Sequence, residues 1–183
     1  CGHQSVEVGY CEAATTTNNV FYNNGSNPNS LAISHHDSSD GESPPSRAHI
    51  ISNNIIVNQD VSGNAVINVE GLDSQITNNV IWRPNDANEG IGVVERPTYI
   101  STNMVAGNQI VGGNNISVAA IRVRADNTVV LGNTMREVSG INHGIYLDAN
   151  GAGSSSDVNG CIVACNYVNG GITNNGGNSP GAV

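Results

Sequence analysis

The sequence contains no lysine, and its six cations are all arginines, set against fifteen acidic residues and a net charge of -9. Charged residues make up only 11 % of the chain, far below the roughly 25 % of an average domain. A nucleic-acid-binding surface needs a basic patch, which six scattered arginines do not build, so we expect no nucleic-acid partner. No apolar run approaches the ~20 residues of a membrane-spanning helix, so we expect no membrane span.

Aromatic residues are scarce at 4 %, and the chain starts with cysteine and shows no signal-peptide pattern. The lack of a leading Met and of a signal-peptide pattern predicts a fragment or a processed part of a longer chain. The 183 residues, of which 38 % are hydrophobic, are enough for one domain with its own core. We therefore expect a single domain over residues 1–183.

Asparagine, glycine, serine, valine and isoleucine fill the composition, and the apolar residues come in short bursts beside asparagine. Six copies of one hexapeptide recur, with the pattern apolar, small polar, Asn or small, Asn, any, apolar. The copies cover residues 16–21, 51–56, 76–81, 100–105, 130–135 and 163–168, and their fourth residues are Asn19, Asn54, Asn79, Asn103, Asn133 and Asn166. A repeat of this length indicates a solenoid.

A second burst follows most copies and reads small residue, Ile, any, apolar. It covers residues 32–35, 90–93, 120–123 and 144–147, with near matches at 66–69 and 5–8. Both bursts alternate with period two and end at Asn or Gly, which is typical of strands and not of helices.

A physical reason exists for asparagine at one register of each repeat. Equivalent residues of stacked coils lie about 4.8 Å apart, and Asn tolerates the left-handed backbone of a tight corner. Its side-chain amide is then able to donate to the amide of the next coil, which builds a ladder along the stack. The alternative is that asparagine only marks turns, but chance turns would not keep the apolar flanks in phase.

With these asparagines and their Ile and Val neighbours, nearly the whole chain resembles the right-handed parallel β-helices of the pectin-lyase-like group. That group includes pectate lyases, polygalacturonases, alginate-modifying enzymes and phage tailspikes. The resemblance implies an all-β fold: a single-stranded right-handed parallel β-helix of about six coils with an asparagine ladder. Residues 171–183 break the period and are expected to form an irregular tail.

In that family the strand of the second burst carries much of the chemistry on its outward side. We align these strands on the inward residues Val6, Ile33, Ile67, Ile91, Ile121 and Ile145. The positions one and three residues later then face outwards, because side chains alternate along a strand. With the acids just past the strands, this face gathers His36, Asp37, Glu70, Glu95, Arg122, Arg124, Tyr146 and Asp148.

The candidate catalytic residues on this face are Glu70, Glu95, Arg122, Arg124 and Asp148. Glu70 and Glu95 are the best carboxylate pair, since neighbouring coils permit the ~5 to 9.5 Å that glycosidases use. Their registers differ by one position, so the alternative is that the two carboxylates point apart. A lyase needs a base and a cation that stabilises the resulting anion. Family lyases use Arg or Lys as the base, and lysine is absent here. The structural alternative is that Arg124 and Asp148 form only a surface ion pair on adjacent coils.

His36, Asn68, Tyr146 and His143 are the candidate substrate-binding residues. Carboxylates and arginines bind sugar hydroxyls and uronates, so the expected partner is a polysaccharide. The expected function is a polysaccharide-binding and polysaccharide-degrading β-helix, either a lyase or a glycoside hydrolase, of tailspike-like depolymerase type. The expected location is extracellular or on a virion surface.

Asp37, Asp40 and Glu42 lie in the longest insertion and offer hard oxygen ligands suited to calcium. The spacing is not that of an EF-hand, and a solvated acidic loop is the alternative. We expect that no cofactor is required, with Ca²⁺ as the one candidate. Cys1 and Cys11 are five or more coils from Cys161 and Cys165, too far for a disulfide between the two ends, so free thiols are expected.

No amphipathic capping helix is evident at the start of the chain, although the ends of a β-helix need covering. A homotrimer or stacking on another domain would meet this need. The rival function is a non-catalytic shaft or adhesin of a phage tail or cell-surface fibre. An ice- or mineral-binding solenoid is a further rival, but it needs a regular Thr or Asp ladder, and the outward columns here are mixed.

Overall fold

A computed structural model describes residues 4–9, 11–22, 31–36, 46–57, 61, 64–94, 102–113, 116–148, 158, 160–169 and 171–174. Every regular element in these residues is a β-strand, and the strands form three parallel sheets. The first sheet has seven strands, in the order β1 (Gln4–Gly9), β4 (Leu31–His36), β7 (Ala65–Glu70), β10 (Glu89–Val94), β13 (Ala119–Arg124), β16 (His143–Leu147) and β18 (Ile172–Asn174).

The second sheet has six strands: β2 (Thr15–Thr17), β5 (Ile50–Ser52), β8 (Gln75–Thr77), β11 (Met104–Ala106), β14 (Val129–Leu131) and β17 (Ile162–Ala164). The third has five: β3 (Val20–Tyr22), β6 (Ile55–Val57), β9 (Val80–Trp82), β12 (Gln109–Val111) and β15 (Thr134–Arg136).

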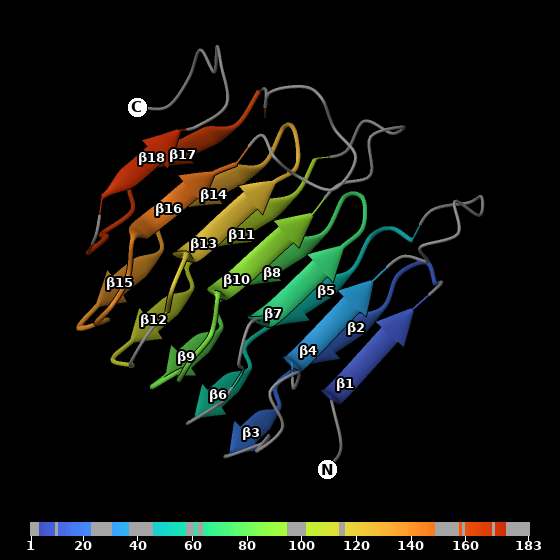
Figure 1. Ribbon diagram of the computed structural model, residues 1–183. Coiled ribbons are helices and arrows are strands. Elements are labelled where there is room, and N and C mark those ends of the chain that lie inside the picture. Colours follow the sequence, from blue (N-terminus) through green and yellow to red (C-terminus); the bar gives the residue numbers. More distant parts are fainter. Residues whose placement is uncertain are drawn as a thin grey trace.

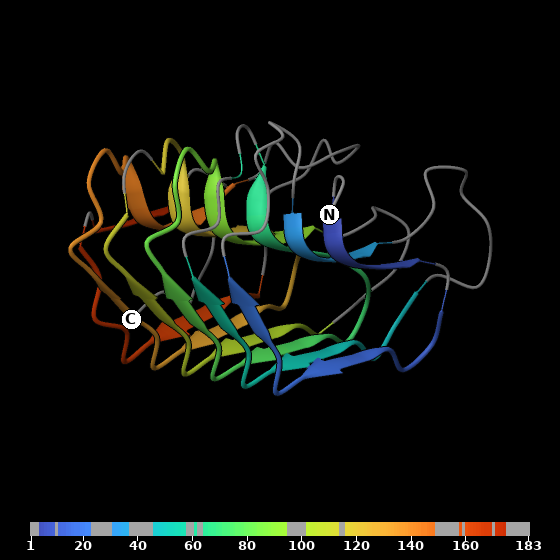
Figure 2. The same cartoon turned by 90° about the horizontal axis from the view of Figure 1, so that it is seen from below.

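Each turn of the chain contributes one strand to each sheet, so the turns stack along one axis (Figures 1 and 2). Five successive turns contain all three strands, from β2–β4 to β14–β16. β1 precedes them, and β17 and β18 follow. The predicted parallel β-helix is therefore confirmed, with about five turns where the sequence predicted about six.

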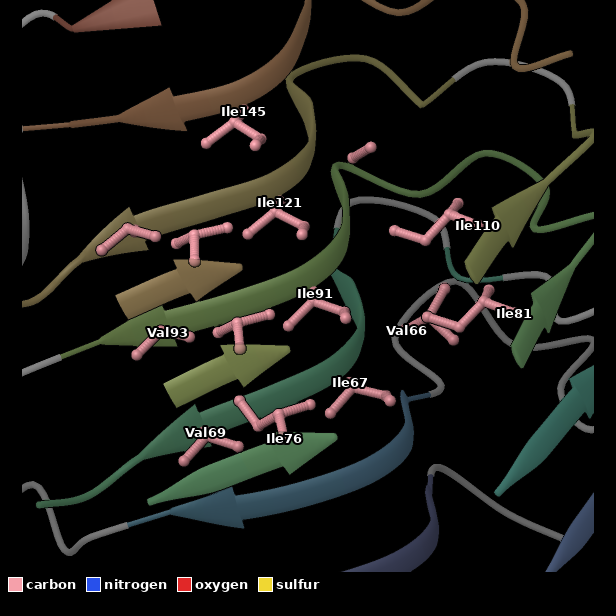
Figure 3. Packing of buried hydrophobic residues seen from close by; sticks show 14 of the residues in the cluster. Val66, Ile67, Val69, Ile76, Ile81, Ile91, Val93, Ile110, Ile121 and Ile145 are labelled. Carbon is pink, nitrogen blue, oxygen red and sulfur yellow. The ribbon is translucent and has the colours of Figure 1, made fainter. Parts of the chain in front are cut away.

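Aliphatic side chains from all three sheets fill the interior of the stack. Ile33, Ile67, Ile91, Ile121 and Ile145 pair with one another in register along the seven-stranded sheet and have no exposed surface. Figure 3 shows four of them, Ile67 to Ile145, in one row. This row is the one on which the sequence was aligned. Fully burying one Ile side chain contributes about 2 kcal/mol, so the row is a major part of the core.

An asparagine ladder runs along the corner between the second and third sheets. In every step the side-chain Nδ2 donates to Oδ1 of the asparagine one turn further on, at 2.9–3.1 Å. That Oδ1 also accepts the backbone N–H of the previous asparagine. The members are Asn19, Asn54, Asn79, Asn108, Asn133 and Asn166.

The fourth member of the ladder differs from the prediction, which placed Asn103 there. Asn103 precedes β11 instead of following it, and it lies at a different corner, where its Oδ1 accepts the backbone N–H of Ser74 at 2.9 Å. Asn108, between β11 and β12, occupies the ladder position. At both corners, the buried polar side chains of successive turns lie next to one another. An asparagine is therefore able to form hydrogen bonds at either corner.

The residue before each ladder asparagine has a left-handed backbone. Its φ is between 56° and 65° at the six positions Asn18, Asn53, Asn78, Gly107, Gly132 and Cys165. At Gly107 a Cβ would lie 2.4 Å from Oδ1 of Asn78, so the Asn78 side chain would have to move to admit one. The corner therefore selects Asn or Gly at most turns.

Two buried histidines interrupt the aliphatic interior near its N-terminal end. His35 and His49 are fully buried, and their Nδ1 atoms are 2.9 Å apart; Nε2 of His35 is 2.8 Å from Oγ1 of Thr16. Burial, then the neighbouring charges of His49 and His36, lower the pKa of His35 to about 4. His35 thus points inwards and is neutral at pH 7, and His36 points outwards, as the strand alternation predicted.

The structure differs from the prediction at residues 172–174, which were placed in an irregular tail. They form β18, and Ile172 pairs with Ile145 of β16. Residues 175–183 lie outside the described part. Among the described residues, Cys11, Cys161 and Cys165 form no disulfide, and Cys1 lies outside those residues. No helix within the described segments is long and apolar enough to span a membrane.

Candidate functional site

A bend in the strands of the seven-stranded sheet decides which residues face outwards. Two adjacent residues of each strand point into the core, as Val66 and Ile67 do on β7 and Ala120 and Ile121 do on β13. In a straight strand, side chains alternate strictly between the two faces, so only one of two adjacent residues would point into the core. The residue two positions before the inward Ile therefore faces outwards together with the residue one position after it.

Glu89, at the start of β10, faces outwards for this reason, although it has the same parity as the inward Ile91. Its carboxylate lies over Gly92, because a Cβ on Gly92 would be 3.1 Å from Oε2 of Glu89 and 3.3 Å from Oδ1 of Asn68. Gly92 pairs with Asn68 on one side and with Arg122 on the other. The missing side chain at Gly92 thus gives the Glu89 carboxylate a place between these two neighbours.

Arg122 on β13 is held by two carboxylates. Its Nη1 donates to Oε1 of Glu89 at 2.7 Å, its Nε donates to Oδ2 of Asp148 at 2.8 Å, and its Nη2 donates to the same Oδ2. Burial alone lowers the pKa of Arg122, but the hydrogen bonds and charges of Glu89 and Asp148 outweigh it and raise the pKa. The side chains of Glu89 and Asp148 are only 6 % and 2 % exposed.

Arg124 faces the same way two residues further along β13, and its environment is different. Among the described residues, its closest carboxylate oxygen is Oε1 of Glu89, 3.8 Å from Nη2, and its buried Nε has no hydrogen-bond partner there. Burial lowers the pKa of Arg124, and the surrounding carboxylates offset only part of that effect. We call Glu89, Arg122, Arg124 and Asp148 the charged cluster.

Aromatic and polar side chains border the charged cluster on β16. The rings of His143 and Tyr146 stack, with centroids 4.6 Å apart, and the Arg122 guanidinium carbon is 6.0 Å from the Tyr146 ring centre. Nδ1 of His143 is 3.0 Å from Oγ1 of Thr173 on β18. This hydrogen bond orients the imidazole and leaves Nε2 as its other polar atom.

On β7 the cluster is bordered by Asn68 and Glu70. Nδ2 of Asn68 donates to Oε1 of Glu70 at 3.2 Å, and both side chains are half-buried. Glu70 also acts electrostatically on Arg124, and Val94 lies between them in the strand register. Four neighbouring strands, β7, β10, β13 and β16, thus contribute to one surface of the molecule.

The structure brings together seven of the residues predicted from the sequence, but not always in the predicted pairs. Asp148 was expected beside Arg124 as a surface ion pair; it is buried and bonds Arg122 instead. These seven residues lie on β7, β13 and β16 and directly after β16: Asn68, Glu70, Arg122, Arg124, His143, Tyr146 and Asp148.

His36 is separate from this group. It lies on β4, where Nε2 is 2.8 Å from Oε1 of Glu7, and β7 and β10 stand between β4 and β13. Glu95 and the candidate calcium ligands Asp37, Asp40 and Glu42 lie outside the described residues. Within the described residues, no three His, Cys, Asp or Glu side chains are grouped to hold a metal ion.

Glu89 is the residue that the sequence interpretation missed. The outward positions were counted one and three residues after the inward Ile, whereas Glu89 precedes Ile91 by two. One signal in the sequence was available. Glu89 aligns with Ala65 on β7 and with Ala119 on β13, so a single acid stands between two alanines at this strand position.

Searches for known relatives found no matching family model, no matching curated protein and no matching solved structure. The functional argument therefore depends on the fold and on the chemistry of this surface.

Proposed function

We propose that the outer surface of β7, β10, β13 and β16 binds a polysaccharide, and that the chain is a β-helix of the pectin-lyase-like kind. The parallel β-helix is compatible with polysaccharide-binding proteins of this architecture. The observation that carries the proposal is the charged cluster, with two guanidiniums and two nearly buried carboxylates on the outer side of the sheet. A setting outside the cell or on a virion surface fits such a ligand.

The fold itself does not require this cluster. The interior is closed by aliphatic residues and the asparagine ladder, and the strands pair through their backbones. Burying charges is costly, and well-packed apolar residues are often at least as stabilising as a buried ion pair. Charges concentrated on four neighbouring strands therefore support a binding role.

Cleavage of the bound polymer is the second part of the proposal, and the surroundings of the carboxylates favour a lyase over a hydrolase. Glu89 and Asp148 accept hydrogen bonds from Arg122, so they are engaged as anions. His143 and Tyr146 are stacked next to Arg122 and are suited to move a proton. A guanidinium beside them would stabilise the anion formed when a proton next to a uronate carboxylate is removed.

The alternative proposal is a non-catalytic shaft or adhesin. The full pairing of Arg122 with carboxylates of its own chain favours this alternative, because cross-strand charge pairs also occur on purely structural sheets. Under this alternative the outer surface would bind no soluble polymer.

The experiment is incubation of the purified chain with uronate-containing and neutral polysaccharides, with reducing ends and the ultraviolet absorbance of unsaturated uronate followed together. A rise in both signals identifies a lyase, and His143→Ala and Tyr146→Phe should then abolish it. Reducing ends alone identify a hydrolase, with Glu70→Gln and Asp148→Asn as the first variants. Binding without either signal supports a binding protein, and no binding by the folded chain supports the shaft or adhesin.

A further inference from the structure

We propose that the outer face of the five-stranded third sheet is a surface for self-association, on which a second copy of this chain docks with the same face of its own. The sheet consists of β3, β6, β9, β12 and β15, which follow one another along the stack in Figure 1. The middle residue of each of these three-residue strands points into the core, so the first and third residues face outwards. This face is not part of the charged cluster, and the proposal is independent of the proposed polysaccharide function.

Seven of the outward side chains of this sheet are apolar and belong to four neighbouring strands. Val20 and Tyr22 on β3 are 69 % and 65 % exposed, and Ile55 on β6 and Trp82 on β9 are 43 % and 46 % exposed. The strand register places the seven residues in two continuous columns along the stack. We call them the apolar face: Val20, Tyr22, Ile55, Val57, Val80, Trp82 and Val111. Single exposed apolar residues are ordinary, whereas a contiguous group of them is typical of a contact with a partner.

The aromatic residues of the apolar face favour a protein as that partner. Tyr22 and Trp82 lie in one column with Val57 between them, so their strands are about 10 Å apart. The Arg83 guanidinium carbon lies over the Trp82 ring, 5.1 Å from its centre, and so occupies a ring face on which a sugar would stack. Trp, Tyr and Arg are the residues that contribute most to the energy of protein–protein contacts.

The distribution of charge favours a second copy of this chain. Arg136 is the one charged residue in the eleven strands of the second and third sheets. The strands of the first sheet, in contrast, carry Glu7, Glu70, Glu89, Arg122 and Arg124. The net charge of -9 makes two copies of the chain repel each other. Contact through the apolar face keeps the charged strands of the first sheet out of the interface.

The apolar face is also able to pack against itself. A two-fold axis through β6 would bring Tyr22 of one copy towards Trp82 of the other, because the two residues lie one strand to either side of Val57 in the register. Two flat sheets of aliphatic side chains pack face to face in this way in β-sandwiches. A standard interface buries about 800 Å² per copy, and four short strands offer less. We therefore expect a reversible dimer that forms in the micromolar range or above.

The test measures the mass of the purified chain by sedimentation equilibrium and light scattering, from low micromolar to millimolar concentration. Trp82 is the only tryptophan of the chain, so its fluorescence emission reports directly on the apolar face. The variants are Tyr22→Glu, which introduces a charge into the contact, and Ile55→Thr, which keeps a β-branched side chain and makes it polar. Leu131→Glu is the matched control, because Leu131 is 41 % exposed on the second sheet.

We expect the mass of the wild type to rise with concentration towards that of a dimer, while the Trp82 emission moves to shorter wavelength. Tyr22→Glu should raise the dissociation constant by about tenfold or more, as loss of a central aromatic contact predicts. Ile55→Thr should raise it by a smaller factor, and Leu131→Glu should leave it unchanged. Circular dichroism checks that each variant is folded, and Ile55→Thr decides the question if Tyr22→Glu does not fold.

A wild type that is monomeric at every concentration would overturn the proposal. If such a monomer showed a Trp82 emission shift on addition of a neutral polysaccharide, the apolar face would be a sugar-binding surface instead. Association that Leu131→Glu weakens as much as Tyr22→Glu would also overturn it, because the contact would then not be specific to the third sheet. None of these outcomes affects the polysaccharide function proposed for the first sheet, which the incubation experiment tests separately.

Discussion

The molecule contains two polar networks that are largely shielded from water, and they are organised on opposite principles. The asparagine ladder is uncharged, repeats the same contact at every turn, and extends along the five complete turns. The charged cluster is described once, combines four side chains of different lengths, and leaves Nε of Arg124 without a hydrogen-bond partner among the described residues. The ladder satisfies its members fully, whereas the cluster does not.

This difference distinguishes the ladder, which stabilises the fold, from the charged cluster, which the fold does not need. A repeated, fully bonded amide removes the cost of burying corner backbone groups at every turn. A single charged group with an unmet donor adds nothing to that stacking and persists only if something else depends on it. Four predictions test this contrast, in order of decreasing effect on stability.

The largest effect should come from breaking the ladder at its centre. Asn79→Ala removes two donated hydrogen bonds and leaves the amide groups of Asn54 without their acceptor. All of these groups are buried, so we expect the free energy of unfolding to fall by about 4 kcal/mol. Urea denaturation followed by circular dichroism measures this loss.

The matched control is Asn19→Ala. Asn19 occupies the same ladder but is exposed, with a neighbour on one side only among the ladder asparagines, so the expected loss is below about 1 kcal/mol. Equal losses at the two positions would show that the ladder is not a stabilising network.

Acid should reveal the one titratable part of the interior, the buried histidine pair. The pKa of His35 is about 4 in the folded chain, against 6.5 when unperturbed, so the unfolded chain binds the proton more tightly. Stability is therefore complete above pH 6.5 and falls as the pH drops towards 4, by about 3 kcal/mol. Thr16, His49 and His36 are the polar groups that face or influence this ring, and none is an acid that would hold the proton.

The measurement is the urea midpoint at pH 7 and at pH 4.5 for the wild type and for His35→Leu. The variant should lose most of this pH dependence, whatever its stability at pH 7. His36→Gln, which changes the exposed neighbouring histidine, should keep it. A pH dependence that survives in His35→Leu would assign it to other groups.

Replacing the charged cluster should distinguish it from the ladder most clearly. Arg122→Met alone removes the guanidinium that bonds both Glu89 and Asp148, and we expect a loss of about 2 kcal/mol. The triple variant Glu89→Leu, Arg122→Met, Asp148→Leu removes all three charges together. Its stability should lie within about 1 kcal/mol of the wild type, or above it, because apolar residues pack well in place of a buried ion pair.

Differential scanning calorimetry and urea denaturation of the two variants give both values. A triple variant that is less stable than Arg122→Met would show that the cluster supports the fold and would remove the argument for its binding role.

The smallest effect should be at Cys165, which is neither Asn nor Gly, unlike the other five left-handed residues that precede a ladder asparagine. Cys165 has φ 56° and is exposed, so its side chain is strained without a packing benefit. Cys165→Asn should raise the free energy of unfolding by about 0.5 kcal/mol. Cys11→Ala is the thiol control and should not stabilise the chain. A destabilised Cys165→Asn would mean that the thiol has a role of its own at this corner.

The periodicity of the apolar residues was enough to predict the fold and the register of the seven-stranded sheet. The row of inward isoleucines is specified because slipping a strand by one residue would expose it. Asn103 was misplaced because two corners of each turn favour buried polar side chains, and in this turn Gly107 stands where the three preceding turns have a second asparagine. Local sequence alone does not distinguish the two corners.

The sequence predicted which residues lie on the outer surface, but it did not predict which of them form ion pairs with one another. Arg122, Arg124 and Asp148 were placed on one face, yet their pairing depends on Glu89, which reaches outwards only because the strand bends. It also depends on Gly92, whose missing side chain admits the Glu89 carboxylate. Side-chain parity describes a straight strand, and the bend of these strands around the core is set by packing between sheets.

The ladder also has a direction. Every step donates from the earlier turn to the later one, so the amide dipoles point the same way and add instead of cancelling. Aligned hydrogen bonds polarise one another, and each bond in such a row is strengthened by its neighbours. A row of six asparagines is therefore a cooperative unit, in which a break at the middle leaves two short, weaker rows and a break at an end leaves one long row.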